Sequence, residues 1–161
     1  DVAVYPPGAG DADLLCRVSS APIAKQGAFS LWPDVDRMFK VLSGQLRLSI
    51  DGATAQAVTA DGPVVAFAGE AEVWGEPVGG ECTVLNIMTA RGRAHSRIAA
   101  HPQATGEGER DILSLALRPF ALDIGARRFE LEPHDALVFP AHDLPELSAG
   151  DAICVELVLQ P

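Results

Sequence analysis

The stretch RMFKVLSGQLRLSIDG, residues 37–52, decides the fold class. Its second half alternates between apolar and polar residues, which places three aliphatic side chains on one face: Leu46, Leu48 and Ile50. A period of two is typical of a half-buried β-strand. The dipeptides Ser43-Gly44 and Asp51-Gly52 are turn formers on either side of this strand. The stretch therefore predicts two short strands bounded by turns.

Short apolar runs with the same period continue in both directions along the chain. The clearest are LLCRVSS, QAVTA, VVAFA, AEVWGE and TVLNIMT, and Gly, Pro or Asp residues separate them. No segment has the apolar spacing of an amphipathic helix three turns long. Short strands at regular intervals are typical of a β-sandwich or a β-barrel, so we expect an all-β protein.

The strand pattern stops once, in the polar stretch ARGRAHSRIAAHPQATGEGER, and then resumes. The resumed part resembles the first part in three places: GQLRLSIDGA beside RPFALDIGAR, DGPVVAFAGE beside HDALVFPAHD, and TVLNIM (83–88) beside CVELVL (154–159). Matches in the same order indicate an internal repeat. We expect a first β-unit at residues 1–92, a connector at 93–110 and a second β-unit at 111–161, packed as one compact structural unit because exposed sheet edges need cover.

Composition narrows the classes of partner. The 161 residues carry a formal net charge of −10, and the 12 Lys and Arg are scattered. Such a chain repels phosphate backbones, so we expect no nucleic-acid partner. No apolar run approaches the roughly 18 residues of a membrane helix, and no signal peptide is visible, so we expect a cytoplasmic protein without membrane contact. The three cysteines are expected to be buried free thiols: Cys16, Cys82 and Cys154.

Four motifs follow one another in the first part of the chain: AVYPPGAGDADLLCRVSSAPIAKQGAFS, GAFSLWPDVDRMFKVLSG, FAGEAEV and VLNIMTARG. Together they resemble the HutD/Ves family. The chain departs from the family pattern at Asp34, where the family has Gly, and at Val84, where it often has Asp. The resemblance implies a bicupin-like fold of two similar antiparallel β-barrel or jelly-roll units. It also implies a binder of a small metabolite, associated with histidine utilisation or, in Ves-like members, with stress responses.

The residue types that catalysis or metal binding needs do not converge in this sequence. The four histidines, His95, His101, His134 and His142, include no H-x-H pair, and none lies in the first unit. A metal-dependent cupin site needs several imidazole and carboxylate ligands on neighbouring strands, so we expect neither a metal nor another cofactor. His134 and His142 are expected to be turn residues. No nucleophile motif and no phosphate-binding glycine loop are present.

Polar residues within apolar strands are the remaining site candidates. Arg17 has the guanidinium fork that binds a carboxylate, and Asn86 can donate and accept hydrogen bonds beside it. Lys40 lies on the same strand face as Met38 and Leu42, and we expect this face to line a ligand pocket. Glu70, at a strand end, is expected to pair with Arg17 or Lys40 when no ligand is bound.

The adjacent acid and base Asp36 and Arg37 complete the candidate ligand-binding set, although their position at a strand start favours a role in shaping the turn. We expect a non-enzymatic binder of a small carboxylate metabolite. Two alternatives stay open: a cupin-superfamily enzyme acting on a small acid or sugar, with Glu70 as its titratable group, and an interaction protein that forms a homodimer.

Overall fold

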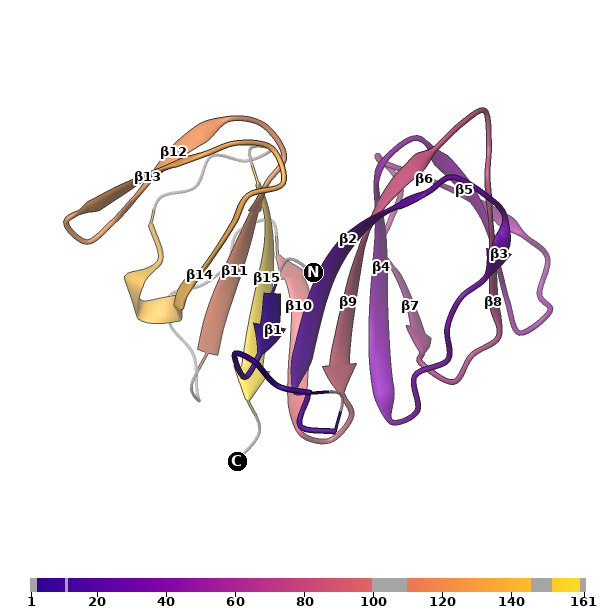
Figure 1. Ribbon diagram of the computed structural model, residues 1–161, viewed down its shortest axis with the longest axis horizontal. Coiled ribbons are helices and arrows are strands. Elements are labelled where there is room, and N and C mark those ends of the chain that lie inside the picture. Colours follow the sequence, from indigo (N-terminus) through magenta and orange to yellow (C-terminus); the bar gives the residue numbers. More distant parts are fainter. Residues whose placement is uncertain (1–2, 11, 100–109, 146–151, 160–161) are drawn as a thin grey trace. The chain divides into compact units, whose positions relative to one another are not determined.

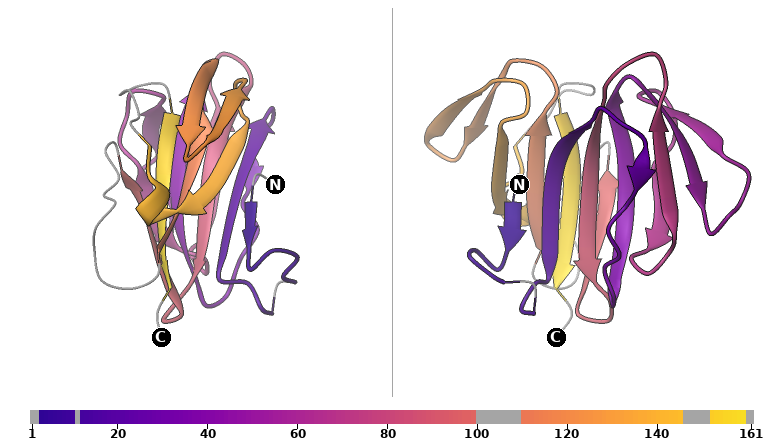
Figure 2. Two further views of the ribbon diagram at one scale, coloured as in Figure 1. Left: turned by 90° about the vertical axis from the view of Figure 1, so that its left-hand side faces the viewer. Right: turned by 45° about the vertical axis from the view of Figure 1, so that its right-hand side comes forward.

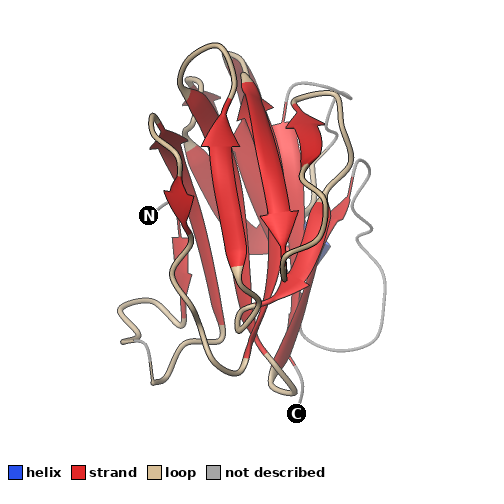
Figure 3. Cartoon of the chain, turned by 90° about the vertical axis from the view of Figure 1, so that its right-hand side faces the viewer, coloured by secondary structure: helices blue, strands red, loops and turns tan. Residues whose placement is uncertain are grey.

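The computed structural model describes residues 3–10, 12–99, 110–145 and 152–159, and β-strands dominate them (Figure 3). The all-β prediction is confirmed. The chain divides into two compact units, Ala3–Arg91 and Gly92–Pro161. Within the described residues, no helix has the length and apolar character that crossing a bilayer requires.

The first unit consists of two antiparallel sheets, with strand orders β1-β2-β9-β4-β7 and β3-β8-β5-β6 (Figure 1). Its strands are β1 (Ala3–Tyr5), β2 (Cys16–Ile23), β3 (Gly27–Ala28), β4 (Val35–Ser43), β5 (Gln45–Ile50), β6 (Gln56–Thr59), β7 (Val65–Ala68), β8 (Val73–Pro77) and β9 (Cys82–Ala90). The strands β2, β9 and β4 are direct neighbours and run side by side (Figures 1 and 2). They form the floor of the site described below.

The core of the first unit is built from inward-facing side chains of both sheets. Phe39 and Val41 from β4 meet Leu46 and Leu48 from β5, and all four are at most 4% exposed. The alternation of QLRLSID therefore gave the correct inner face, with Ile50 half-buried at its end. Removing a fully buried ring such as that of Phe39 typically costs about 3–5 kcal/mol of unfolding free energy.

Gly44 carries the chain from one sheet to the other. The strands on either side of it, β4 and β5, belong to different sheets and do not pair with each other. Gly44 has φ +78°, and a Cβ atom there would lie 2.9 Å from the Glu81 carbonyl oxygen. The backbone conformation and the close approach both require glycine. The Asp51-Gly52 turn instead begins the loop between β5 and β6, which do pair.

The second unit repeats this plan on a smaller scale. Its sheets have the strand orders β10-β15-β11-β14 and β12-β13. Its elements are β10 (Ala94–Ala99), β11 (Arg110–Ala116), β12 (Phe120–Ile124), β13 (Arg127–Leu131), β14 (Ala136–Pro140), the short 3-10 helix η1 (Ala141–Asp143) and β15 (Ala152–Leu159). Ile112, Leu122, Phe139 and Cys154 form its core cluster. All three cysteines of the chain are free and buried, as expected.

The segment that we expected to be a connector, residues 93–110, begins with a strand, β10. β10 pairs with β15 over six residues, from Ala94 opposite Leu159 to Ala99 opposite Cys154. β10 is an edge strand, so one side of it needs no strand partner and its composition can stay polar. A search for alternating apolar residues did not detect this strand because its composition is polar. Residues 100–109, including His101, lie outside the described residues.

Candidate functional site

A pocket of about 330 Å³ lies on the inner face of β2, β9 and β4 in the first unit. We call it the arginine pocket. Its polar lining residues are Arg17 and Ser19 from β2, Ser30, Arg37 from β4 and Asn86 from β9. Aromatic and other apolar side chains complete the lining, among them Phe29, Trp32, Phe39 and Met88. The pocket therefore joins three strands with residues 28–32, the segment that follows β3.

Strand register explains why these side chains meet. Met88 in the central strand β9 pairs with Arg17 on one side and with Arg37 on the other. In the next row on the same face, Asn86 pairs with Ser19 and Phe39. Strands about 4.8 Å apart place the Cα atoms of the two arginines about 10 Å from each other. Two guanidinium groups thus project from opposite sides of one central strand.

Arg37 is buried and its hydrogen-bond acceptors are neutral. Its Nε and Nη2 donate to the Asn86 Oδ1 atom at 3.2 and 3.1 Å, and its Nη1 donates to the Ser30 carbonyl oxygen at 3.1 Å. The guanidinium carbon also lies 5.6 Å from the centre of the Phe29 ring and 5.0 Å from that of Phe67. Burial lowers the pKa of Arg37 from its ordinary value. An arginine stays protonated even so, which leaves a positive charge in a poorly hydrated place.

Arg17 brings a second positive charge to the pocket. Its guanidinium carbon lies 5.5 Å from the centre of the Trp32 ring, a cation–π geometry that fixes the pocket wall against the floor. The residues that line the pocket include these two arginines and no Asp or Glu. Although the whole chain carries a net charge of −10, this pocket is locally cationic. Chemically, it can bind a small anion through forked, charge-assisted hydrogen bonds.

Lys40 does not take part in this pocket, contrary to our expectation. Its Nζ donates to the carbonyl oxygens of Ala60 at 2.5 Å and Gly62 at 2.6 Å, so it ties down the turn after β6. The strand faces explain the error. Arg37 and Phe39 line the pocket on one face of β4, and Lys40 belongs to the other. Arg37, which we had assigned to turn shaping, is the β4 residue that carries charge into the pocket.

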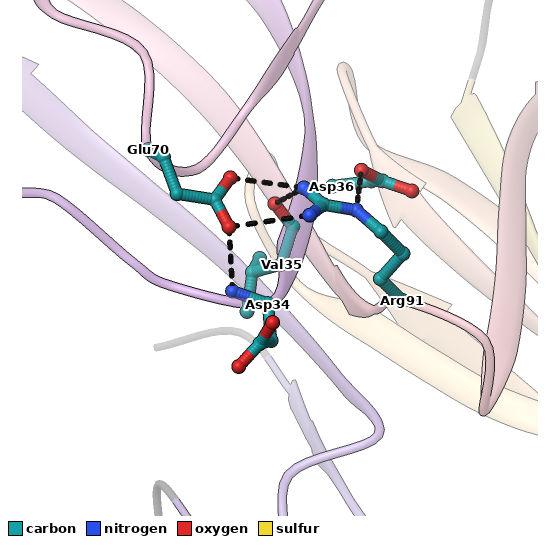
Figure 4. Close-up of polar contacts among 5 residues, drawn as sticks. All are labelled: Asp34, Val35, Asp36, Glu70 and Arg91. Atoms are coloured by element: carbon teal, nitrogen blue, oxygen red, sulfur yellow. Dashed lines mark hydrogen bonds and ion pairs between the residues drawn. The ribbon is translucent and has the colours of Figure 1, made fainter.

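Asp36 and Glu70 belong to a separate, exposed ionic cluster around Arg91 (Figure 4). The Arg91 Nε donates to the Asp36 Oδ1 at 2.9 Å, and Arg91 Nη2 donates to the Glu70 Oε2 at 2.9 Å. We call these three residues the Arg91 clamp. Glu70 therefore pairs with Arg91, not with Arg17 or Lys40 as we had expected. The hydrogen bonds from the Arg91 side chain and the Asp34 backbone N–H hold the pKa of Glu70 at about 2, below its usual 4.5.

The Arg91 clamp holds the segment that forms the pocket wall. The backbone N–H of Asp34 donates to the Glu70 Oε1 at 2.8 Å, and the N–H of Arg91 donates to the Asp34 carbonyl at 2.9 Å. One step away, the N–H of Trp32 donates to the Gly69 carbonyl at 2.8 Å. A Cβ atom at Gly69 would lie 2.1 Å from the Trp32 carbonyl oxygen, so only glycine permits this approach.

None of the three described histidines is among the residues that line the arginine pocket. His134 occupies a turn with φ +76°, as expected, and His142 lies in η1 with its Nε2 atom 3.8 Å from the Asp143 carboxylate. His95 lies on β10. Within the described part of the chain, no three His, Cys, Asp or Glu side chains gather in a way that could hold a metal ion.

The sequence did not indicate Ser30, Phe29 or Arg91 as parts of the site. Ser30 contributes a backbone carbonyl to Arg37, which any residue type could supply, so its side chain gave no signal. Phe29 and Arg91 had been counted only as members of the motifs GAFSLWPDVDRMFKVLSG and VLNIMTARG. The motifs themselves were the available signal for the Arg91 clamp, because its three residues come from three different motifs: GAFSLWPDVDRMFKVLSG, FAGEAEV and VLNIMTARG.

The HutD family model matches residues 1–155 of the chain. The chain belongs to the HutD family. Its fold is shared with HutD from Pseudomonas fluorescens SBW25, solved in a formate condition, at a TM-score of 0.74 and 20% identity, over 99% of this chain and 86% of that one. A protein of unknown function from Pseudomonas aeruginosa PAO1 matches at a TM-score of 0.73 and 26% identity, over 98% of this chain and 85% of that one.

A cupin 2 conserved barrel domain protein from Leptotrichia buccalis matches this HutD-family chain at a TM-score of 0.55 and 11% identity, over 90% of this chain and 83% of that one. The HutD-family chain therefore has a cupin-like jelly-roll fold, as expected. A comparison with curated proteins gives no match.

Proposed function

We propose that this HutD-family protein binds a small carboxylate-bearing metabolite in the arginine pocket and does not convert it. The observation that carries the proposal is the buried guanidinium of Arg37, whose hydrogen-bond acceptors, Asn86 and Ser30, are neutral. A charge withdrawn from water without a counter-ion is unfavourable, and a bound anion would supply the counter-ion. Binding of this kind fits a regulatory role in histidine utilisation or in a stress response.

The chemistry of the lining favours a carboxylate over other anions. Guanidinium groups match the two oxygens of a carboxylate geometrically, and the Asn86 amide can orient a third contact because its Oδ1 already faces Arg37. Phe29 and Trp32 supply apolar surface for the carbon part of the ligand. The P. fluorescens HutD was solved in a formate condition, and formate is the smallest carboxylate, so formate is a natural first probe.

The catalytic alternative finds little support at Glu70. Its carboxyl has a pKa of about 2 and is fixed by Arg91, so it is a weak base at neutral pH, and it is not among the pocket-lining residues. The homodimer alternative stays a prediction, which light scattering can test.

Arg37→Met is the direct test of the proposal. Methionine keeps much of the apolar stem and removes the charge, so we expect the dissociation constant for formate, formylglutamate or urocanate to rise roughly 10- to 100-fold where the unmodified chain binds. Isothermal titration measures this change. The matched control is Arg47→Met on β5, since the Arg47 side chain is 62% exposed and faces a carboxylate of β8 at 3.7 Å. Equal affinities in the two variants, or no binding of any carboxylate by the unmodified chain, would contradict the proposal.

A further inference from the structure

The two units place equivalent strands in equivalent positions. The order β10-β15-β11-β14 in the second unit corresponds to β2-β9-β4-β7 in the first. The hairpin β12-β13 falls between β11 and β14 in sequence, as β5 and β6 fall between β4 and β7. Each unit thus has a central strand, β9 or β15, between two neighbours. In the first unit the central strand β9 and its neighbours β2 and β4 form the floor of the arginine pocket.

The two units can be aligned at Phe39 of β4 and Ile112 of β11, because each is a buried core residue on a strand next to the central strand of its unit. In the first unit Phe39 pairs with Asn86, and Arg37 precedes Phe39 by two residues on the same face. In the second unit Ile112 pairs with Glu156, and Arg110 precedes Ile112 by two residues. With Ile112 aligned to Phe39, Arg110 is the counterpart of Arg37, and Glu156 is the counterpart of Asn86. The same alignment places Arg97, which pairs with Glu156, at the position of Ser19, which pairs with Asn86. The sequence comparison of TVLNIM with CVELVL sets Asn86 beside Leu157, which differs from this alignment by one residue.

The second unit buries a carboxylate where the first has an amide. The Glu156 side chain is 2% exposed, and its Oε2 atom lies 2.7 Å from the Arg97 Nη2 and 3.8 Å from the Arg110 Nη1. Arg97 Nε also donates to this oxygen at 2.7 Å. Arg97 lies on β10 and Arg110 on β11, the two neighbours of β15. The Glu156 carboxylate therefore lies between two arginines from the flanking strands: Arg97, which is 59% exposed, and Arg110, which is 10% exposed.

We propose that Glu156 fills, from within the chain, the second unit's counterpart of the arginine pocket. The first unit then binds a free carboxylate, while the second is satisfied by its own. It follows that removal of the Glu156 carboxylate opens a second site for a small carboxylate. The statement about the first unit rests on the proposed function, whereas the statement about the second rests on the Glu156 contacts alone.

Glu156→Ala creates a vacancy of known shape. The atoms removed are one methylene and one carboxylate, which acetate replaces with the same charge and nearly the same size. Arg110, whose side chain is 10% exposed, loses a buried counter-ion in this variant, and such a loss destabilises a protein strongly. A ligand that binds only the folded state raises its stability by mass action. Acetate should therefore rescue the variant, and neutral acetamide should not.

The experiment compares thermal midpoints in acetate and in acetamide at constant ionic strength, and locates binding by backbone amide NMR shifts. We expect Glu156→Ala to have a lower thermal midpoint than the unmodified chain, and acetate to raise this midpoint more in the variant than in the unmodified chain. Acetate should also shift the backbone amide signals of β11 and β15 in the variant. The matched control is Glu130→Ala on β13, an exposed glutamate of the same unit, which should respond as the unmodified chain does.

The reciprocal variant is Asn86→Glu. It places a carboxylate beside Arg37 on the central strand of the first unit, as Glu156 stands beside Arg110 in the second. We expect the amides of β4 and β9 to lose their response to acetate, with affinity in the first unit reduced by at least about tenfold. If Glu156→Ala does not fold, this variant decides: loss of the response supports the correspondence, and an unchanged response overturns it.

The outcomes separate the two proposals. If Glu156→Ala folds and responds to acetate and acetamide alike, without shifts in β11 and β15, the inference about Glu156 is wrong and the proposed function is untouched. If the unmodified chain gives no acetate response while Glu156→Ala does, the inference about the second unit is supported and binding in the first unit is contradicted.

Discussion

Asp34 holds a left-handed backbone conformation, with φ +59°. Glycine adopts this conformation without steric cost, and the HutD/Ves pattern has glycine at this place. We expect Asp34→Gly to leave the free energy of unfolding unchanged or to raise it by up to about 1 kcal/mol. Asp34→Val should lower it by about 1–2 kcal/mol, because a branched side chain clashes there. Urea unfolding of both variants measures the difference. Equal stability of the two would contradict the claim that the left-handed conformation at position 34 favours glycine.

Glu70 should make stability depend on acidity. Its folded pKa of about 2 lies below its usual 4.5, so its contribution is fully present above pH 4.5 and is lost as the pH falls toward 2. Thermal midpoints of the unmodified chain and of Glu70→Gln should therefore differ at pH 7 and converge as the pH falls through this window. Glu76→Gln is the control, because the Glu76 side chain is exposed and lies 3.7 Å from Arg47. A gap between the first two proteins that stays constant with pH would contradict this role of Glu70.

Three of the six residues predicted from sequence line the arginine pocket: Arg17, Arg37 and Asn86. The role of Arg37 was misjudged because both faces of β4 carry apolar residues. Phe39 and Val41 share the face of Arg37, whereas Met38 and Leu42 share that of Lys40. Alternation alone separates two faces and does not say which is inside. That choice depends on the sheet that packs against β4, which is distant in sequence.

At the scale of elements, the wall of the arginine pocket depends on the turn between β7 and β8. Gly69→Ala would drive a methyl group into the Trp32 carbonyl oxygen, and into the Val35 carbonyl oxygen at 2.9 Å. We expect a loss of about 1–3 kcal/mol in the free energy of unfolding and weaker carboxylate binding, because Trp32 lines the pocket. Gly27→Ala on β3 is the control, since a Cβ atom there meets nothing within 4 Å. Unfolding and titration curves that match for the two variants would refute this dependence.

The sequence predicted most strands of the first unit but not how they pair. Gly44 was recognised as a turn residue, yet the chain crosses there to the other sheet and does not form a hairpin. The edge strand β10 was missed because its pattern is polar. Turn chemistry and alternation are local properties, whereas sheet membership and edge position depend on contacts between strands far apart in the chain.

At the scale of the whole molecule, the internal repeat was visible in the sequence and is confirmed by the matching strand orders of the two units. Its most informative detail was not visible, because a shift of one residue in a strand moves every side chain to the other face. The proposed correspondence of Glu156 with Asn86 rests on the pairing of β15 with β11 and of β9 with β4, which the sequence alone does not give. The two units therefore share a plan and differ in the charge on their central strand.

The contact between Arg17 and Trp32 gives the molecule an optical property. A guanidinium 5.5 Å from the indole ring sets the electric field in which that ring emits. An anion that arrived at Arg17 would change this field, and so change the colour and yield of Trp32 fluorescence. The second tryptophan, Trp74, is 48% exposed and does not line the arginine pocket, so its emission should be that of a solvent-exposed indole and should not respond to an anion in the pocket. Trp32 is thus an intrinsic fluorophore in the lining of the arginine pocket, so its fluorescence would report occupancy of the proposed site without an added label.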